Sequence, residues 1–231
     1  MNKATIASQI DKVLTRIAAA ATQASRLSED ITLIAVSKTK PASDIEAAAA
    51  CGLKDFGENY LQEALDKIQA LQAFELTWHF IGPIQSNKTR PIAEHFDWVH
   101  SVDRLKIAQR LSDQRPAHLG PLNICLQVNI SNEDTKSGVS AEQAPELAKV
   151  IATLPNIRLR GVMAIPQPSD DPTEQAAAFE AVAALFNTLR LTNPELDTLS
   201  MGMSQDLEAA IAAGSTMVRI GTDIFGARNR S

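Results

Sequence analysis

The stretch that decides the fold is Ile31-Thr-Leu-Ile-Ala-Val36, which is followed by the loop Ser37-Lys-Thr-Lys-Pro41 and by an alanine-rich run that ends at Gly52. The first stretch is short, almost wholly apolar and rich in β-branched residues, as is typical of a parallel strand covered on both faces. The alanine-rich run over 44–51 has the composition of a helix, and glycine commonly follows a helix end. The order therefore predicts a strand, a loop and a helix.

The same unit recurs along the chain. Strands alternating with helices imply parallel pairing through right-handed crossovers, and eight such units favour a (β/α)8 TIM barrel of class α/β over an open doubly wound sheet. The loop 37–41 also lacks the glycine fingerprint of a dinucleotide-binding turn. We expect one domain over residues 1–231, with an extra amphipathic N-terminal helix over 1–26 that packs on the barrel through Ile6, Ile10, Val13, Leu14 and Ile17. The strands are expected at 31–36, 55–56, 76–81, 98–101, 122–130, 157–165, 197–201 and 216–220, and the later helices at 44–51, 61–71, 88–95, 104–114, 141–154, 173–191 and 207–213.

Composition narrows the class of protein. The 231 residues are 45% hydrophobic and 21% charged, with 10 Gly and 11 Pro, which is typical of a globular chain with a large core. The longest stretch without a charged residue, 116–132, contains prolines, a histidine and amides, so it does not predict a membrane span. The sequence shows no secretory leader pattern, and we therefore expect a cytoplasmic location.

Charge and cysteine usage exclude further classes. A formal net charge of −5 disfavours a nucleic-acid partner, which is usually met by a clustered basic face. Cys51 and Cys125 form no metal-ligand or disulfide spacing, and we interpret both as reduced packing residues. We expect no metal site.

In a barrel, the residues that carry chemistry follow the carboxyl ends of the strands. Lys38 directly follows the apolar strand 31–36, where desolvation and the neighbouring Lys40 would favour a nucleophilic amine able to form a Schiff base. The alternative is a structural lysine at the barrel rim whose ammonium group reaches solvent.

The loops after the last two strands are rich in small and hydroxyl residues. Residue types of this kind surround a phosphate at this end of a barrel, and here they are Ser200, Ser204, Gly221 and Thr222. The alternative is that Ser204 caps the next helix and Gly221 turns the chain. Arg219 alternates with apolar neighbours, so its cation points into or across the barrel end and needs an acceptor. His79 is interpreted as a hydrogen-bonded core or rim residue, in preference to a metal ligand.

Several long motifs stand out along nearly the whole chain. They are Ala35-Val-Ser-Lys-Thr-Lys-Pro41, Phe56-Gly-Glu-Asn-Tyr60, Trp78-His-Phe-Ile-Gly-Pro-Ile-Gln-Ser-Asn-Lys88, Gly161-Val-Met163, Leu199-Ser-Met-Gly-Met-Ser204 and Val218-Arg-Ile-Gly-Thr-Asp-Ile-Phe-Gly226. In residues and in order, these motifs resemble the pyridoxal phosphate homeostasis protein family. This family is similar to the N-terminal barrel of alanine racemase, a fold-type III barrel that carries pyridoxal 5′-phosphate (PLP). Asp223 is a minor departure, because many members have a small residue there.

The resemblance assigns a role to each candidate residue. It implies that Lys38 forms a covalent aldimine with PLP and that Arg219 faces the pyridine nitrogen, where a cation weakens the ring as an electron sink. It also implies that Asn59 lies beside the cofactor, with His79 and Met163 lining the same mouth. The residues implied to hold the phosphate are Ser200, Ser204, Gly221 and Thr222.

The resemblance implies a PLP carrier or buffer that contributes to vitamin B6 and amino-acid homeostasis, with no catalytic residues. Racemisation needs a second base, which alanine racemases take from a further domain, whereas this chain ends soon after Gly226 and has Tyr60 as its single tyrosine. An amino-acid racemase or other PLP enzyme stays open as the alternative, and a cofactor-free Schiff-base aldolase is a third. We expect a monomer, with PLP-dependent apo-enzymes as recipients of the cofactor.

Overall fold

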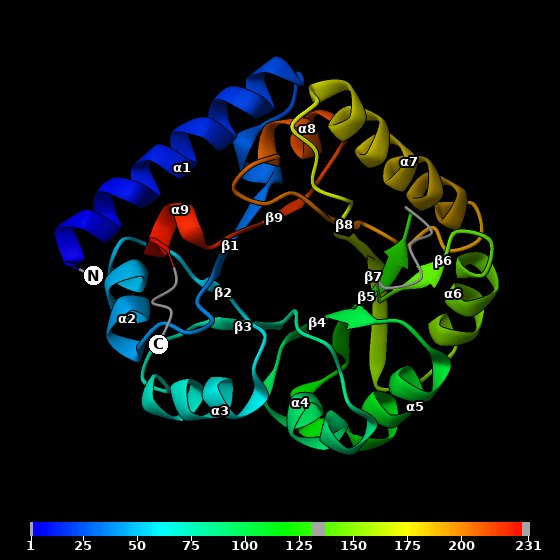
Figure 1. Ribbon diagram of the computed structural model, residues 1–231. Helices are drawn as coiled ribbons and strands as arrows, with labels where there is room; N and C mark the ends of the chain where they lie inside the picture. The colour runs from blue at the N-terminus through cyan, green and yellow to red at the C-terminus, as the bar shows by residue number, and fades with distance from the viewer. Residues whose placement is uncertain (1, 131–136, 228–231) are drawn as a thin grey trace.

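Eight parallel strands form a closed ring in the computed structural model, which describes residues 2–130 and 137–227 (Figure 1). The ring closes because β1 pairs with both β2 and β9, while β4 pairs with β5. This closed barrel confirms the predicted fold class. Its strands are β1 (Thr32–Val36), β2 (Asp55–Glu58), β3 (Thr77–Phe80), β4 (Trp98–Val102), β5 (Leu122–Asn129), β7 (Ile157–Ala164), β8 (Thr198–Ser200) and β9 (Met217–Ile220).

Helices cover the outside of the barrel (Figure 1). Each predicted helix is present, with ends that differ from the prediction by a few residues. Within the described residues, no helix is both long and apolar enough to traverse a bilayer. The helices are α1 (Lys3–Gln23), α2 (Ala42–Ala50), α3 (Leu61–Ala70), α4 (Thr89–His95), α5 (Leu105–Gln114), α6 (Ala144–Ala152), α7 (Pro172–Arg190), α8 (Leu207–Ala212) and α9 (Thr222–Phe225), with short 3-10 turns at Ser28–Asp30, Ser86–Lys88 and Ala117–Leu119.

Two short elements were not predicted. Strand β6 (Val139–Ser140) extends the sheet beside β5, with Val128 opposite Val139, and helix α9 follows β9 directly. A two-residue strand is too short to show an alternating pattern, and a four-residue helix is too short to show helical periodicity.

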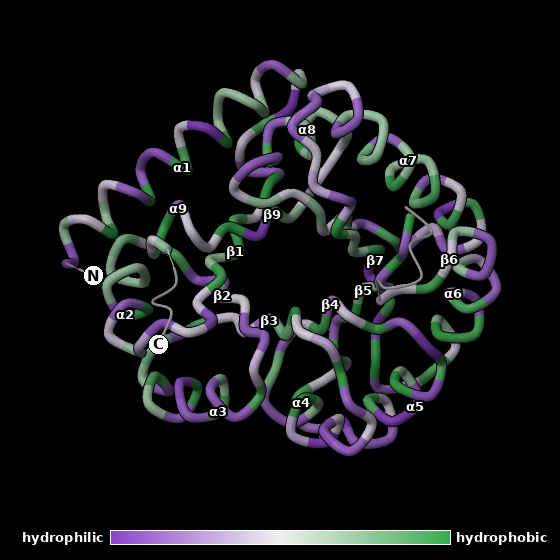
Figure 2. The backbone as a smooth tube through the Cα atoms, in the orientation of Figure 1, coloured by the Kyte–Doolittle hydropathy of each residue, from purple (hydrophilic) through white to green (hydrophobic). Residues whose placement is uncertain are grey.

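Helix α1 packs one face against α2, α8 and α9, and Figure 2 shows hydrophilic and hydrophobic residues alternating along it. Ile6, Ile10, Val13 and Ile17 are buried as predicted. Leu14 was expected on the same face but is 41% exposed. It directly follows Val13, and a step of one residue turns about 100° around a helix, so its side chain leaves the buried stripe.

The barrel has two separate apolar regions. The larger cluster fills the space between the strands and the helices. The smaller one lies inside the ring. Met163 is paired with Ser200 and Ile34 with Arg219, and residues paired across parallel strands point to the same face of the sheet. Polar side chains therefore share the barrel interior with this small cluster, whose members are Ile34, Trp98, Cys125, Met163 and Met217.

Candidate functional site

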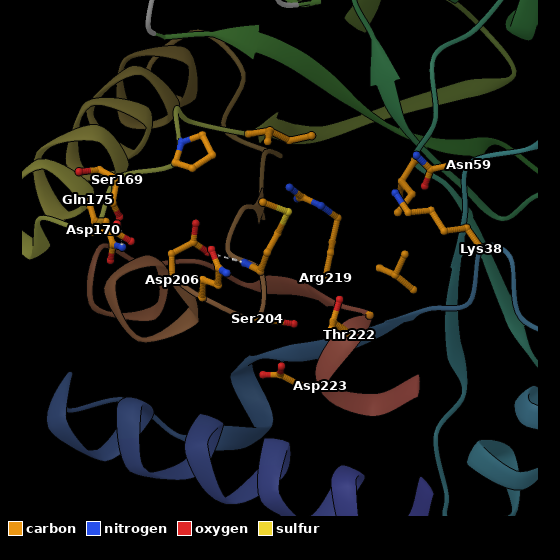
Figure 3. Close-up of a pocket in the computed structure, with 17 residues that line it drawn as sticks. Lys38, Asn59, Ser169, Asp170, Gln175, Ser204, Asp206, Arg219, Thr222 and Asp223 are labelled. Atoms are coloured by element: carbon orange, nitrogen blue, oxygen red, sulfur yellow. Dashed lines mark hydrogen bonds between the residues drawn. The ribbon is translucent and has the colours of Figure 1, made fainter. Parts of the chain in front are cut away.

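A cavity of about 450 Å³ lies at the carboxyl ends of the strands. In Figure 3 Lys38 and Asn59 approach it from one side, Arg219 projects between them and Asp206, and Ser204 and Thr222 lie along one edge. The structure thus brings together a primary amine, an amide, a guanidinium and two hydroxyls. The predicted residues that line this cavity are Lys38, Asn59, Ser204, Arg219, Gly221 and Thr222.

The residue before Lys38 is held by a buried ion pair. The Ser37 hydroxyl donates to Glu58 Oε1 at 2.6 Å, and Lys67 Nζ donates both to the same oxygen and to the Ser37 carbonyl, each at 2.8 Å. Burial raises the pKa of Glu58, while Lys67 and Ser37 oppose that rise. Glu58 Oε2 is also buried, with no hydrogen-bond partner among the described residues. The carboxylate therefore depends on Lys67 for its charge balance.

The residue after Lys38, Thr39, is held by Glu63, which belongs to the same cluster of charged side chains as Glu58 and Lys67. Thr39 has a φ of 64°, a left-handed conformation that is uncommon outside glycine. Its backbone N–H donates to Glu63 Oε1 at 2.6 Å, and Glu63 also pairs with Lys67. The turn that carries Lys38 is therefore fixed on both sides from α3. We call Glu58, Glu63 and Lys67 the outer clamp.

Lys40, which was considered for its effect on the Lys38 amine, binds backbone carbonyls of the C-terminal segment. Its ammonium group donates to the carbonyls of Phe225 at 2.8 Å and Ala227 at 3.1 Å. It therefore ties the loop after β1 to the segment that follows β9. These contacts close one side of the barrel end near the cavity.

Arg219 is a buried cation in the cavity wall. Its Nη1 donates to Ser200 Oγ at 2.7 Å and its Nη2 to the Ala164 carbonyl at 3.0 Å. Burial lowers the pKa of Arg219 to about 10, with Asp206 acting in the opposite direction, so the guanidinium stays charged at neutral pH. The Ser200 hydroxyl and the Ala164 carbonyl, both neutral acceptors, fix the guanidinium in the wall of the cavity, where a ligand can contact it.

A line of hydrogen bonds continues behind Arg219 through the barrel interior. Burial lowers the pKa of His100 well below its ordinary value, so this imidazole is neutral. His100 Nδ1 lies 2.8 Å from Ser200 Oγ, and its Nε2 lies 2.9 Å from His79 Nδ1. His79 Nε2 lies 2.9 Å from Asp55 Oδ1. We call Ser200, His100, His79 and Asp55 the interior relay.

Asn59 lines the cavity, and the loop after β3 packs closely against its backbone. A Cβ at Gly82 would lie 2.2 Å from the Asn59 carbonyl oxygen, so only glycine fits there. Asn59 Oδ1 is buried without a hydrogen-bond partner among the described residues. An acceptor atom in this state at the edge of a cavity is suited to a donor on a bound molecule.

The loop after β8 forms the edge that carries Ser204. Gly202 has a φ of +98°, and a Cβ there would lie 2.6 Å from Ala210. The Met203 N–H donates to Asp206 Oδ1 at 2.6 Å, which fixes the following turn. Burial raises the pKa of Asp206, and the Met203 N–H and Arg219 oppose that rise.

Helix α1 also reaches this edge. Arg16 Nη2 donates to the Ser204 carbonyl at 2.9 Å, and its other nitrogens pair with Glu208 at 2.8 Å and with Asp223 at 2.6 Å. Asp223 is thus a partner of Arg16. The extra helix therefore braces the edge of the cavity.

Three predicted residues lie deeper than expected. His79 and Met163 precede Ile81 and Ile165 by two positions, and these isoleucines line the cavity. Two residues along a strand advance by about 6.6 Å on the same face, so His79 and Met163 lie one layer below the mouth that they were expected to line. Ser200, expected at the phosphate, is fully buried, and its hydroxyl contacts His100 and Arg219.

Sequence reasoning missed the outer clamp, Arg16, and the members of the interior relay other than His79 and Ser200. Glu58 was one signal, because it follows the predicted strand 55–56 by two residues, and a carboxylate that is buried beside a strand needs a partner. His100 was another, since it too lies within a predicted strand. Among the described residues, no three His, Cys, Asp or Glu side chains gather in a way that suits a metal ion.

Comparison with known proteins connects this geometry to one family. The model of the alanine racemase N-terminal domain matches residues 13–229. The pyridoxal phosphate homeostasis protein of Pseudomonas aeruginosa is 62% identical over 225 residues, covering 97% of this chain and 96% of the relative. That of Escherichia coli K12 is 56% identical over 229 residues, covering 98% of each. The structure of PipY from Synechococcus elongatus with PLP bound has a TM-score of 0.84 and 35% identity, covering 96% of this chain and 100% of that one.

Proposed function

The chain belongs to the pyridoxal phosphate homeostasis protein family, built on the alanine racemase N-terminal barrel, and from this premise we propose that it binds PLP in the cavity at the carboxyl ends of its strands. In this role the protein carries and buffers PLP and thereby contributes to vitamin B6 and amino-acid homeostasis. The single observation that carries the proposal is the arrangement of Lys38, Arg219 and the Ser204–Thr222 edge around one cavity.

The residues of the cavity fit the chemical groups of PLP one by one. The hydroxyls of Ser204 and Thr222, beside Gly221, suit the phosphate. Arg219 supplies a fixed cation for the pyridine ring, and the buried Oδ1 of Asn59 offers an acceptor for a donor on that ring. A cavity of about 450 Å³ is of the size that small-molecule cofactors occupy.

When bound, PLP supplies an aldehyde that reacts reversibly with primary amines. Lys38 provides the amine, and the outer clamp aims it by holding the residues on either side. Arg219 would hold a positive charge beside the pyridine ring, and this charge would disfavour protonation of the ring nitrogen. Such an environment would favour storage of PLP over chemistry on amino acids.

The lining of the cavity also favours a carrier over a racemase. Two-base proton transfer needs a second proton-transfer group facing the cofactor, in alanine racemases a tyrosine. Among the described residues that line the cavity there is no tyrosine, histidine or cysteine. Of its three carboxylates, Asp206 accepts from the Met203 N–H, Asp223 pairs with Arg16, and Asp170 is exposed to solvent. Tyr60, the single tyrosine of the chain, is 52% exposed and precedes α3. We infer a monomeric carrier that transfers PLP to PLP-dependent apo-enzymes.

The first test is the visible absorption of the purified protein with added PLP, before and after borohydride, with peptide mapping of the reduced adduct. We expect a yellow protein whose adduct maps to Lys38. Lys38→Ala should abolish the trapped adduct and keep the thermal stability. Lys40→Ala is the matched control and should keep the adduct, because that ammonium group binds backbone carbonyls. An adduct that persists in Lys38→Ala overturns the assignment.

A turnover assay separates a carrier from an enzyme. The protein loaded with PLP is incubated with single amino acids, and racemisation or deamination is compared with that caused by free PLP at the same concentration. We expect no rate well above free PLP. Sustained turnover of any amino acid would reject the carrier and favour the racemase. Cleavage of a sugar phosphate by a colourless protein would favour a cofactor-free aldolase.

A further inference from the structure

The interior relay joins the two ends of the barrel. Asp55 is the first residue of β2, and its side chain is 28% exposed, at the end of the barrel opposite the cavity. His79, His100 and Ser200 are fully buried. Hydrogen bonds connect them in this order, starting from Asp55 and ending at Arg219 in the cavity wall. The four hydrogen bonds of this line measure 2.7 to 2.9 Å between heavy atoms. A change at Asp55 therefore has a direct polar route to the cavity.

With both imidazoles neutral, the donors and acceptors of the relay fit in only one order. A carboxylate only accepts, so His79 donates from Nε2 to Asp55 and is left with Nδ1 as an acceptor. His100 must then donate from Nε2 to His79, which leaves its own Nδ1 to accept the proton of the Ser200 hydroxyl. Ser200 Oγ in turn accepts from Arg219, which has no acceptor to offer. Every hydrogen bond points from the guanidinium toward Asp55.

A buried line of hydrogen bonds destabilises the fold if any of its members loses its partner. Its neighbours inside the barrel are apolar, including Trp98, whose ring stacks on His79 at 5.8 Å between centroids. A buried polar group without a partner costs about 1–3 kcal/mol, so each member of the relay depends on the next. Removing the acceptor at Asp55 frees His79 to reverse its tautomer, and the reversal would propagate to the Ser200 hydroxyl. Ser200 Oγ would then accept from both His100 and Arg219, and its own proton would lose its acceptor in the relay, which would change the geometry of the bond to Arg219.

We propose that the interior relay is a positioning device for Arg219: Asp55, at the far end of the barrel, fixes the tautomers of both histidines and thereby the orientation of the guanidinium in the cavity wall. Ser200 belongs to this device and acts on a bound ligand through Arg219. The inference rests on the proposed function only for its effect on PLP, because the relay itself is a property of the protein without ligand.

The relay is tested first without PLP, by long-range ¹H–¹⁵N NMR of the histidine rings at neutral pH. We expect His79 and His100 both to carry their proton on Nε2. His100→Gln and His79→Gln, each made separately, assign the two rings. A proton on Nδ1 of either ring, or an imidazolium at either position, overturns the order of donors and acceptors. This measurement stands whether or not the protein binds PLP.

The effect on the cavity is tested with Asp55→Ala, Asp55→Asn and the control Asp97→Ala. Asp97 lies at the same end of the barrel, and its carboxylate accepts a hydrogen bond from the Trp78 N–H and not from the relay. We expect Asp55→Ala to shift the visible spectrum of bound PLP and to raise its dissociation constant about fivefold, the effect of losing one hydrogen bond. Asp55→Asn, whose Oδ1 still accepts from His79, should restore both values.

Three outcomes separate the inference from its premise. An Asp55→Ala spectrum equal to that of the wild type, or a shift that Asp97→Ala reproduces, overturns the positioning role. A shift that Asp55→Asn does not restore also overturns it. If the wild-type protein binds no PLP, the proposed function fails, and the tautomers measured by NMR still decide the relay.

Discussion

Replacing Lys67 by methionine removes the cation of the outer clamp while keeping most of the length of the side chain. Lys67 is 6% exposed and Glu58 is 0% exposed, so the remaining carboxylate has no access to water. One oxygen of Glu58 keeps the Ser37 hydroxyl, and the other already lacks a partner among the described residues. The variant therefore holds a buried charge that nothing nearby neutralises.

Breaking a buried ion pair from one side costs about 3–5 kcal/mol. For a domain of this size each kcal/mol lowers the melting temperature by about 2–4 °C, so Lys67→Met should melt roughly 6–20 °C below the wild type. Loss of Lys67 also raises the pKa of Glu58 further, since the lysine opposed the effect of burial. A carboxyl whose folded pKa is raised stabilises the fold at low pH and loses that contribution as the pH rises through the folded pKa. The deficit of the variant should therefore shrink on acidification.

The assay is thermal and urea unfolding of four proteins at pH 5 and pH 8. Lys149→Met is the matched control, because it breaks an exposed pair with Glu146 and should cost less than about 1 kcal/mol. The double variant Lys67→Met with Glu58→Gln removes both charges and should recover much of the loss. A single variant within about 1 kcal/mol of the wild type, or a double variant no more stable than the single one, would refute the reasoning.

The remaining predictions concern reactivity, the edge of the cavity and a close backbone approach. Cys125 is buried, and burial raises its pKa to about 12, whereas Cys51 is exposed. Iodoacetamide at pH 8 should therefore modify Cys51 alone in the native protein and both thiols in urea, as measured by mass spectrometry. Labelling of both thiols in the native protein would contradict this. Arg16→Met should cost less than about 1 kcal/mol of stability yet weaken PLP binding about fivefold in titrations at low salt, and equal affinities would disprove the brace. Gly82→Ala forces a Cβ to 2.2 Å from the Asn59 carbonyl and should destabilise the fold by about 1–3 kcal/mol in urea unfolding. Gly52→Ala, with open space around it but a φ of +91°, measures the cost of backbone strain without a steric clash.

The architecture was predictable because each barrel strand is a short apolar run between turn signals. The apolar run over 31–36 and the motif that ends at Lys38 place the amine without any knowledge of distant contacts. The rule that chemistry follows the carboxyl ends of strands then selects Arg219, Gly221 and Thr222 in the same way. Six of the predicted residues line one cavity for this reason. The periodicity of apolar residues and the order of strands and helices are local properties of the chain, and they can be predicted from a sequence.

The depth of a residue inside the barrel was not predictable in this way. His79 and Ile81 lie on one face of the same segment, and only the register with β2 and β4 decides which one reaches the cavity. The outer clamp is harder still, because Lys67 lies on a helix and looks like a solvated lysine in a pattern of period 3.6. Besides Glu63 on the same helix, its partners are Glu58 of β2 and the Ser37 carbonyl after β1, and these two contacts exist only once α3 packs on the barrel.

The two polar networks support the cavity from opposite sides of the barrel wall. The outer clamp lies between the strands and α3, and it holds the turn that presents Lys38. The interior relay lies inside the ring and holds Arg219. An apolar shell resists compression but does not specify a hydrogen-bonding direction, whereas a satisfied polar network does. The amine and the cation can therefore keep a fixed relation to each other even though the mouth of the cavity is formed by loops, and this fixed relation is what a ligand with an aldehyde at one position and a ring nitrogen at another requires.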